Sequence, residues 1–291
     1  MKDRIDPLIE ERAPWLFRDH VWSRPSRAAL NRMLGYNRTL ALAAHFRDRP
    51  MTEIMGTMGE MLARDVQVTG LENVPRQGPA LIVANHPTGI ADGIIMHWVL
   101  NRVRPDSYFY ANSDILRLLP QMDALIAPVE WRVEKRSHAK TRETMAYTRR
   151  AVDQGRLGVI FPAGRLAKRR RLKLYERPWM ASAAMIARKF DLPVIPVNVR
   201  ARNSALFYLF DVIHPTLRDI TLFHETLNKA RQPYRVTVGE AISPSALPAK
   251  SEDGIELLRQ ATLALGGRYA PSVSLVQNTR VPSWAKPAVG Q

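Results

Sequence analysis

Apolar residues in the first 64 positions of the chain recur at spacings of three and four. Two blocks carry this pattern, residues 30–44 and residues 54–62. The spacing is typical of amphipathic helices that bury one face. The sequence therefore predicts a helical appendage over residues 1–64.

The apolar pattern changes at Asp65 to short continuous runs bounded by turn residues. Such runs are typical of buried strands, and the segments between them are long enough for helices. The clearest runs are residues 80–84, 125–129, 157–161 and 192–199. The alternation predicts an α/β fold, a mostly parallel layered sheet flanked by helices, over residues 65–279. A last run, residues 234–238, is expected to form a strand at the sheet edge. We expect residues 165–177 to form an irregular stretch and residues 280–291 to form a flexible tail.

The charge of the chain favours an anionic partner. There are 43 Lys and Arg residues against 27 Asp and Glu residues, a formal net charge of +16. Nucleic acid, an anionic membrane surface and an acidic carrier all suit such a charge. Helix-turn-helix, zinc and aromatic RNA-binding signatures are absent, so we expect no nucleic acid. A basic nucleic-acid- or anionic-membrane-binding protein without catalysis is the alternative to an enzyme.

Several residue patterns are missing from the chain. Cysteine is absent, which excludes disulfides, thiolate zinc sites and a cysteine nucleophile. No glycine-rich nucleotide motif is present. No run approaches the roughly 18 to 20 apolar residues of a membrane span, and no secretory leader opens the sequence. We therefore expect no cofactor, no metal, no membrane span and an intracellular location.

Two segments combine the residue types that bind anionic surfaces. Trp15, Phe17 and Trp22 lie among arginines, a mixture that suits a helix in a lipid interface. The alternative is that these aromatic side chains pack onto the main domain. The second segment is a nearly continuous basic run that we expect to bind a membrane or a carrier, or else to be a solvated loop: Lys168, Arg169, Arg170 and Arg171.

A histidine and an aspartate follow the predicted strand at residues 80–84. His86 comes directly after the strand, next to Asn85, and Asp92 lies where the next helix begins. An imidazole held by a carboxylate takes a proton from a hydroxyl, so these residue types suit a catalytic dyad. In the alternative, His86 only ends the strand and Asp92 is a favourable charge at the helix N-terminus.

A second candidate binding segment follows the strand at residues 157–161. Pro162 and Gly164 form a turn that exposes backbone amides, and Arg165 beside it suits a phosphate or carboxylate. The alternative is a basic loop that acts only through its general charge.

Four segments in this order resemble the glycerolipid acyltransferase superfamily, which includes 1-acylglycerol-3-phosphate acyltransferases. The matching blocks are Asn85 and His86 with Asp92, residues 127–132, residues 161–165 and residues 194–197. Five residues separate His86 from Asp92 where the family has four, and Ala163 stands where the family has Glu. At both departures the chain is similar to a bacterial hemolysin-like branch that includes ornithine-lipid O-acyltransferases. It is similar to the same branch in segments 203–208, 215–218 and 227–229.

The resemblance implies a direct acyl transfer without an acyl-enzyme intermediate. His86 is then the general base, Asp92 orients it, and Arg165 holds the anionic group of the acceptor. Arg132 is expected to assist Arg165, with Lys135 or Arg136 as the alternatives. Backbone donors near Gly164 or at the start of the helix after Asp92 would stabilise the oxyanion. The implied donor is an acyl carrier protein or coenzyme A thioester, and the acceptor is lysophosphatidic acid or a lyso-aminolipid. The implied location is peripheral, on the cytoplasmic face of the inner membrane.

Overall fold

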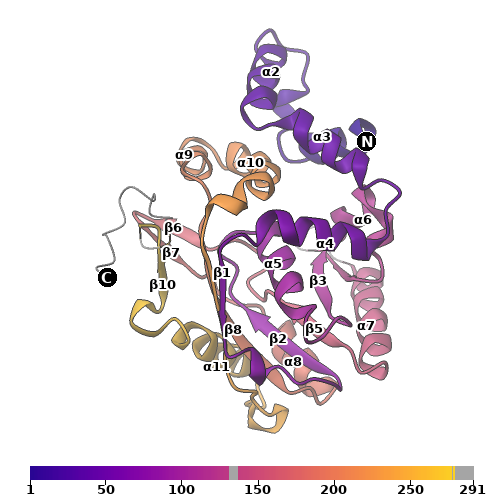
Figure 1. Ribbon diagram of the computed structural model, residues 1–291, viewed down its shortest axis with the longest axis vertical. Coiled ribbons are helices and arrows are strands. Elements are labelled where there is room, and N and C mark those ends of the chain that lie inside the picture. The colour runs from indigo at the N-terminus through magenta and orange to yellow at the C-terminus, as the bar shows by residue number, and fades with distance from the viewer. Residues whose placement is uncertain (131–136, 277, 279–291) are drawn as a thin grey trace, which may run out of the picture.

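The central element of the computed structural model is a sheet, and the model describes all residues except 131–136, 277 and 279–291. In that part of the chain seven strands pair in the order β1, β9, β8, β2, β5, β3, β4 (Figure 1). Strands β8 to β4 are parallel, whereas the antiparallel β8–β9 pair reverses β9 and β1. The predicted α/β fold with a mostly parallel sheet is confirmed. The strand bounds are β1 (Val66–Thr69), β2 (Ala80–Ala84), β3 (Tyr108–Asn112), β4 (Ile126–Val129), β5 (Leu157–Ile160), β8 (Val194–Arg200) and β9 (Tyr234–Val238).

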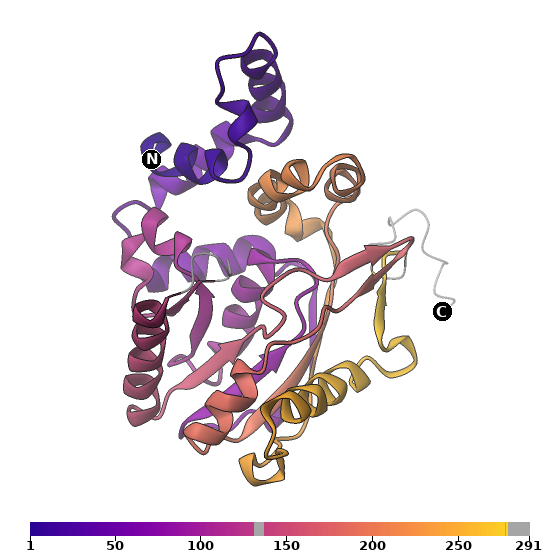
Figure 2. The same ribbon diagram turned by 180° about the vertical axis from the view of Figure 1, so that it is seen from behind.

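Helices cover both faces of this sheet (Figures 1 and 2). On one face lie α4 (Met51–Leu62) and α5 (Ile90–Leu100), and on the other α7 (His138–Asp153), α8 (Ser182–Lys189) and α11 (Ser251–Ala264). Successive side chains of a strand point to opposite faces. In β2, Ile82 accordingly packs into the first layer, whereas Leu81 and Val83 pack into the second.

The first 64 residues are helical, as the apolar spacing predicted. They form α1 (Lys2–Glu10), α2 (Ser23–Met33), α3 (Tyr36–His45) and α4. Ile5, Ile54 and Met55 belong to the same buried cluster as Ile82 of the sheet. The hydrophobic core therefore continues across residue 64, while α2 lies farther from the sheet (Figure 1).

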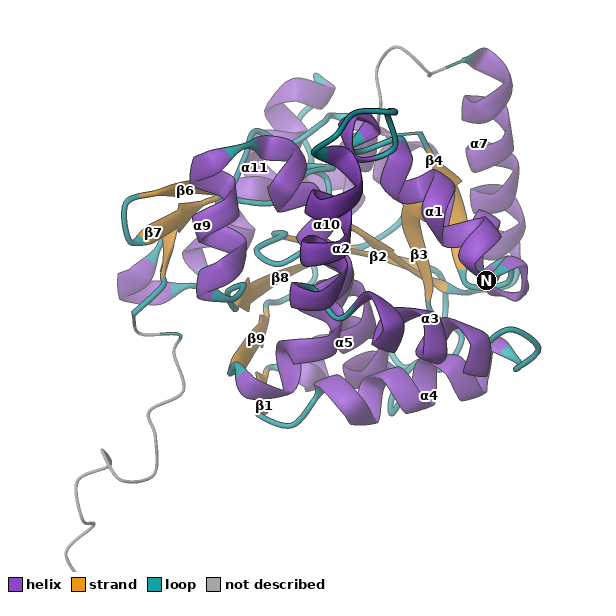
Figure 3. Ribbon diagram, turned by 90° about the horizontal axis from the view of Figure 1, so that it is seen from above, coloured by secondary structure: helices purple, strands orange, loops and turns teal. Residues whose placement is uncertain are grey.

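Two helices and a small sheet lie near the carboxyl ends of the parallel strands. The helices α9 (Ala205–Ile213) and α10 (Pro215–Asn228) pack against each other. Beside α9, β6 (Lys168–Arg170) and β7 (Lys173–Tyr175) form a hairpin to which β10 (Ser272–Ser274) adds a strand (Figure 3). Leu174 of the hairpin is buried with Phe207 of α9 and Val273 of β10. No helix in the described residues has both the length and the apolar character needed to cross a bilayer.

Three details of the sheets differ from the expectations. Residues 168–175 form a hairpin rather than an irregular stretch, because Leu174 gives it a buried side. Strand β9 is not at the sheet edge, because β1 pairs with its outer side and places Val66 opposite Tyr234. The aromatic residues 108–110, which the apolar runs did not single out, begin β3.

Candidate active site

The loop between β2 and α5 brings His86 and Asp92 together. Nδ1 of His86 lies 3.0 Å from Oδ2 of Asp92, and the Asp92 side chain is fully buried while that of His86 is 19% exposed. The N–H direction does not meet regular hydrogen-bond geometry, so a small rotation of the ring is needed to align it. Catalytic hydrogen bonds often become aligned only when substrate binds.

The carboxylate of Asp92, in the first turn of α5, is held in place by the loop that precedes the helix. Its Oδ2 accepts hydrogen bonds from the backbone N–H groups of Thr88, at 2.8 Å, and Gly89, at 3.0 Å. Its Oδ1 accepts a third from the Thr88 hydroxyl at 2.5 Å. Gly89 has φ of +94°, a conformation that side chains rarely tolerate. This turn lets α5 start at Ile90, so the five-residue spacer still returns Asp92 to His86.

A buried tyrosine extends this hydrogen-bond network. The hydroxyl of Tyr234, in β9, lies 2.6 Å from Oγ1 of Thr88 and 3.5 Å from Oδ1 of Asp92. Because Thr88 already donates its proton to Asp92, Tyr234 donates to Thr88. Complete burial raises the pKa of Tyr234 well above its usual value, which keeps it a neutral donor. Sequence analysis missed Tyr234, since it lies 146 positions from Thr88.

Glu176 and Phe161 support His86 from two other segments. Oε2 of Glu176 accepts the backbone N–H of His86 at 3.2 Å, and Oε1 accepts the indole N–H of Trp179 at 3.0 Å. Burial raises the pKa of this carboxyl group to about 7. The ring of Phe161 stacks on the imidazole with 4.4 Å between centroids. Glu176 is the only acidic residue in the basic stretch 165–177, which was the one available signal in the sequence.

Asn85 has a role that its sequence position did not indicate. Its side-chain amide donates to the carbonyl of Val199 at 2.8 Å and accepts the Val199 N–H at 2.6 Å, and the residue is 3% exposed. These bonds tie the end of β2 to β8, directly before His86. The structure therefore favours a positioning role for Asn85 over the substrate contact predicted from the sequence.

The turn after β5 lies on the wall of the same cleft as His86. Pro162, Gly164 and Arg165 all line it. The N–H of Gly164 donates to the carbonyl of Phe161 at 2.9 Å, and the Pro162 carbonyl accepts from Met180. The amide of Gly164 is thus engaged within the turn rather than directed at an oxyanion. Arg132, expected to assist Arg165, and its alternatives Lys135 and Arg136 lie outside the described residues.

Positive charge gathers beside this turn. Arg165 is exposed, and the half-buried Arg177 lies near it. Burial, followed by the guanidinium groups of Arg165 and Arg218, lowers the pKa of Arg177. Arg218 already pairs with Asp219 at 2.7 Å and Asp211 at 3.1 Å. Arg165 and Arg177 are thus the guanidinium groups best placed to bind an anion in the cleft.

The cleft has a volume of about 2030 Å³ and two chemically different parts. One part contains His86 and the basic side chains. The other is apolar and is enclosed by α3, α4, α5, α6 (Asp114–Leu118) and β3. Its lining includes Leu42, Phe46, Met55, Met58, Ile94, Phe109 and Leu118. An aliphatic chain suits the apolar part, and an anionic group suits the basic part.

Within the described residues no group of three or more His, Asp or Glu side chains is arranged to hold a metal.

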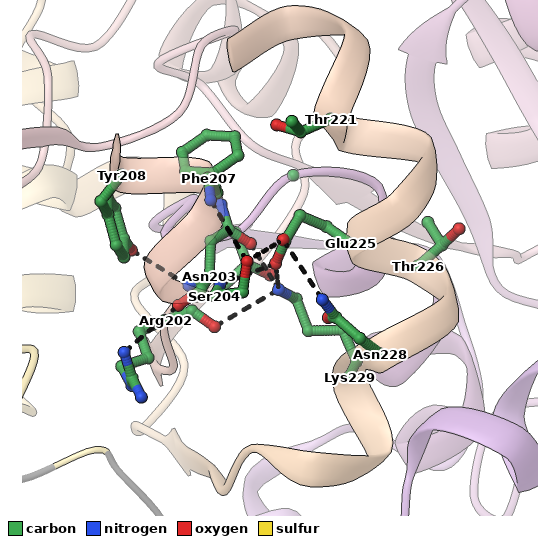
Figure 4. Close-up of polar contacts among 12 residues, drawn as sticks. Arg202, Asn203, Ser204, Phe207, Tyr208, Thr221, Glu225, Thr226, Asn228 and Lys229 are labelled. Carbon is green, nitrogen blue, oxygen red and sulfur yellow. Dashed lines mark hydrogen bonds and ion pairs between the residues drawn. The ribbon is translucent and has the colours of Figure 1, made fainter. Parts of the chain in front are cut away.

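A buried ion pair joins α10 to the loop after β8 (Figure 4). Nζ of Lys229 lies 2.7 Å from Oε2 of Glu225, and both side chains are at most 1% exposed. Glu225 also accepts the N–H of Ser204 at 2.9 Å, and Lys229 donates to the side chain of Asn203. The segments 203–208 and 227–229 that carried the branch resemblance meet here, so they hold α9 and α10 beside the cleft.

The aromatic residues near the N-terminus have different environments. Trp15 and Phe17 are half-buried in a cluster with Phe210 and Ile220 of α9 and α10, and the indole of Trp15 donates to Thr216 at 3.3 Å. The structure therefore favours the packing alternative for these two residues. Trp22 is 71% exposed.

The basic run becomes the β6–β7 hairpin, in which Lys168, Arg170 and Arg171 are exposed and Arg169 is half-buried near Asp211.

Comparison with known proteins identifies the family of the central region. Residues 65–200 match the family model described as Acyltransferase. A lyso-glycine lipid O-acyltransferase from Phocaeicola vulgatus is 24% identical over 189 residues, 63% of this chain and 66% of that protein. Another, from Bacteroides thetaiotaomicron, is 25% identical over 162 residues, 56% of this chain and 58% of that protein. The matches span less than two thirds of these relatives.

A solved structure resembles the chain more distantly. The LPA acyltransferase PlsC from Thermotoga maritima aligns with a TM-score of 0.48 and 14% sequence identity, over 93% of this chain and 98% of that chain. The family resemblance seen in the four sequence blocks is confirmed by the family match, which spans all four of them. Residues 65–200 of this chain are an acyltransferase-family domain.

Proposed function

We propose that the protein is an O-acyltransferase that moves a fatty acyl group from a thioester to a free hydroxyl of a lysolipid. The observation that carries the proposal is the 3.0 Å contact between His86 and Asp92 on the wall of a cleft with an apolar part. In this proposal the apolar part accommodates the acyl chain, and His86, which lines the same cleft, acts on the acceptor hydroxyl.

The reaction follows from the proton positions in the dyad. A carboxylate facing Nδ1 keeps the proton on that nitrogen, which leaves the Nε2 lone pair of His86 to accept a proton from the acceptor hydroxyl. The hydroxyl oxygen bonds to the thioester carbonyl carbon. When the tetrahedral intermediate collapses, the C–S bond breaks and the thiolate takes the proton back from Nε2. Asp92 stabilises the imidazolium during this cycle.

The acceptor that we favour is a lyso-aminolipid rather than lysophosphatidic acid. The relatives from Phocaeicola and Bacteroides are named for lyso-glycine lipid, and two of the sequence departures pointed to an aminolipid branch. Arg165 and Arg177 suit a carboxylate as well as a phosphate. Either an acyl carrier protein or coenzyme A is proposed to carry the acyl group, and neither the dyad nor the cleft requires a cofactor.

The proposed location is peripheral, on an anionic membrane surface at the cytoplasmic face. The net charge of +16 supports this location, because basic side chains near anionic lipids contribute about 1 kcal/mol each.

The test is a transfer assay with detergent-solubilised protein. Long-chain acyl carrier protein and acyl coenzyme A serve as donors, and lyso-glycine lipid, lyso-ornithine lipid and lysophosphatidic acid serve as acceptors, with product identified by mass. We expect product from an aminolipid acceptor, and none with His86→Ala that retains the wild-type melting temperature. Product from lysophosphatidic acid alone would overturn the proposed lyso-aminolipid acceptor. A fully active His86→Ala variant would overturn the assignment of His86 as the general base.

A further inference from the structure

One helix beside the cleft exposes an apolar stripe. In α9 the side chains of Leu209, Val212 and Ile213 are 55%, 66% and 59% exposed. Their positions at i, i+3 and i+4 place them on one side of the helix. The opposite side carries Phe207 and Phe210, which are buried. α9 thus carries apolar side chains on its outer side as well as on its buried side, which is typical of a helix whose outer face also meets a nonpolar environment.

The adjacent hairpin presents a similar residue pattern at its tip. Leu172 is 64% exposed and lies between Arg171 and Lys173, which are exposed as well. Leu174 packs against Phe207, so the hairpin and α9 form one continuous part of the molecule (Figures 2 and 3). We call Leu172, Leu209, Val212 and Ile213, with Lys168, Arg170, Arg171 and Lys173, the α9–hairpin surface.

The chemistry of this surface favours an anionic bilayer over a soluble protein. Apolar side chains flanked by Lys and Arg insert among acyl chains while the cations contact lipid headgroups. The acidic residue on α9, Asp211, is already paired with Arg218 at 3.1 Å. The basic side chains of the hairpin therefore add to the positive field of the patch.

The position of the surface is also informative. The inner face of α9, through Phe207 and Tyr208, lines the cleft, as do Lys168 and Arg169 of the hairpin. The exposed stripe thus belongs to the same wall that borders the cleft. A bilayer in contact with this stripe would lie beside the cleft in which His86 is found.

We propose that the α9–hairpin surface inserts into an anionic membrane and delivers a lipid acceptor from the bilayer to the cleft. The inference rests on the proposed lysolipid acyl transfer for its purpose, but the membrane contact itself is measured separately. It differs from the expectation for the N-terminal aromatic residues, because Trp15 and Phe17 are packed against α9 and α10.

The test measures binding of the full chain to phosphatidylcholine vesicles with and without phosphatidylglycerol. The triple substitution of Leu209, Val212 and Ile213 by Ser should weaken binding to the anionic vesicles roughly tenfold or more, since apolar burial is lost. Arg171→Glu with Lys173→Glu should weaken it similarly and reduce its dependence on salt. The matched controls, Leu257→Ser on α11 and Arg142→Glu on α7, should bind as wild type does.

A second measurement separates this proposal from the acyltransferase proposal. In detergent micelles, where no bilayer is present, the Ser triple variant should transfer acyl groups as wild type does. If the triple variant binds vesicles with wild-type affinity, the proposal that the α9–hairpin surface contacts the membrane is overturned, whatever the transfer assay shows. Unchanged vesicle binding with weaker use of acyl carrier protein would also overturn it and assign the surface to the carrier. Absence of transfer by wild type, with vesicle binding lost in the variants, would overturn only the acyl transfer.

Discussion

The substitution Asp92→Asn tests the role of the carboxylate with little change of shape. Oδ2 of Asp92 accepts two backbone N–H groups at 2.8 and 3.0 Å, so an asparagine must place its oxygen there. Its NH2 group then faces Oγ1 of Thr88, which is able to accept a hydrogen bond. The oxygen still faces Nδ1 of His86. We therefore expect a folded protein that has lost about 1 kcal/mol of unfolding free energy.

The expected loss of rate follows from the distance within the dyad. An imidazolium and a carboxylate 3.0 Å apart attract each other by about 5.5 kcal/mol at an effective dielectric constant of ~20. The imidazole carries only part of the positive charge in the transition state, and an amide oxygen still faces it. A loss of about 2–3 kcal/mol remains, which corresponds to a roughly 30- to 150-fold decrease in kcat.

The assay follows the thiol released from acyl coenzyme A or acyl carrier protein. The chain contains no cysteine, so the enzyme adds no thiol background. Asp153→Asn, at the exposed end of α7, is the matched control and should have the wild-type kcat. A folded Asp92→Asn protein with kcat within about twofold of wild type would refute the reasoning, because charge at Asp92 would then contribute nothing to the barrier.

Four further substitutions test the surrounding groups. Tyr234→Phe removes the 2.6 Å hydrogen bond to the Thr88 hydroxyl, so the free energy of unfolding in urea should fall by about 1–1.5 kcal/mol and kcat by less than ~10-fold. An unchanged free energy of unfolding would contradict this prediction. Arg177→Ala should raise KM for an anionic acceptor roughly 10- to 100-fold with kcat nearly constant. Lys229→Met leaves Glu225 unpaired and should lower the free energy of unfolding by about 3–5 kcal/mol. Because the folded-state pKa of Glu176 is raised from 4.5 to about 7, wild-type stability should fall as pH rises between those values, and Glu176→Gln should flatten that slope in thermal melts.

Much of the fold was predictable because burial leaves a local pattern. Each strand with a continuous apolar run, such as residues 80–84, was found from that run, and the helices α3 and α4 were found from the spacing within residues 30–44 and 54–62. The aromatic strand β3 and the basic hairpin were missed, since neither has an uninterrupted aliphatic run. The position of β9 inside the sheet depended on β1, and strand pairing has no signature within either strand.

The candidate site was likewise predictable from the sequence only in part. The residue types in the loop 85–92 predicted a dyad, and the structure places His86 and Asp92 in contact. The positive φ of Gly89 that makes the contact possible could not be read from the spacing. Tyr234 and Glu176 reach the loop from β9 and from the end of the hairpin, so only the folded chain brings them there.

The sequence by itself determined the fold class, the family blocks and the residues of the dyad, because periodicity and motifs are properties of neighbouring positions. The tertiary structure decided that Asn85 ties β2 to β8, that Trp15 packs rather than faces solvent, and that an apolar cleft adjoins His86. These features join segments that are distant along the chain. Their contacts depend on strand order and helix packing, which no local pattern specifies.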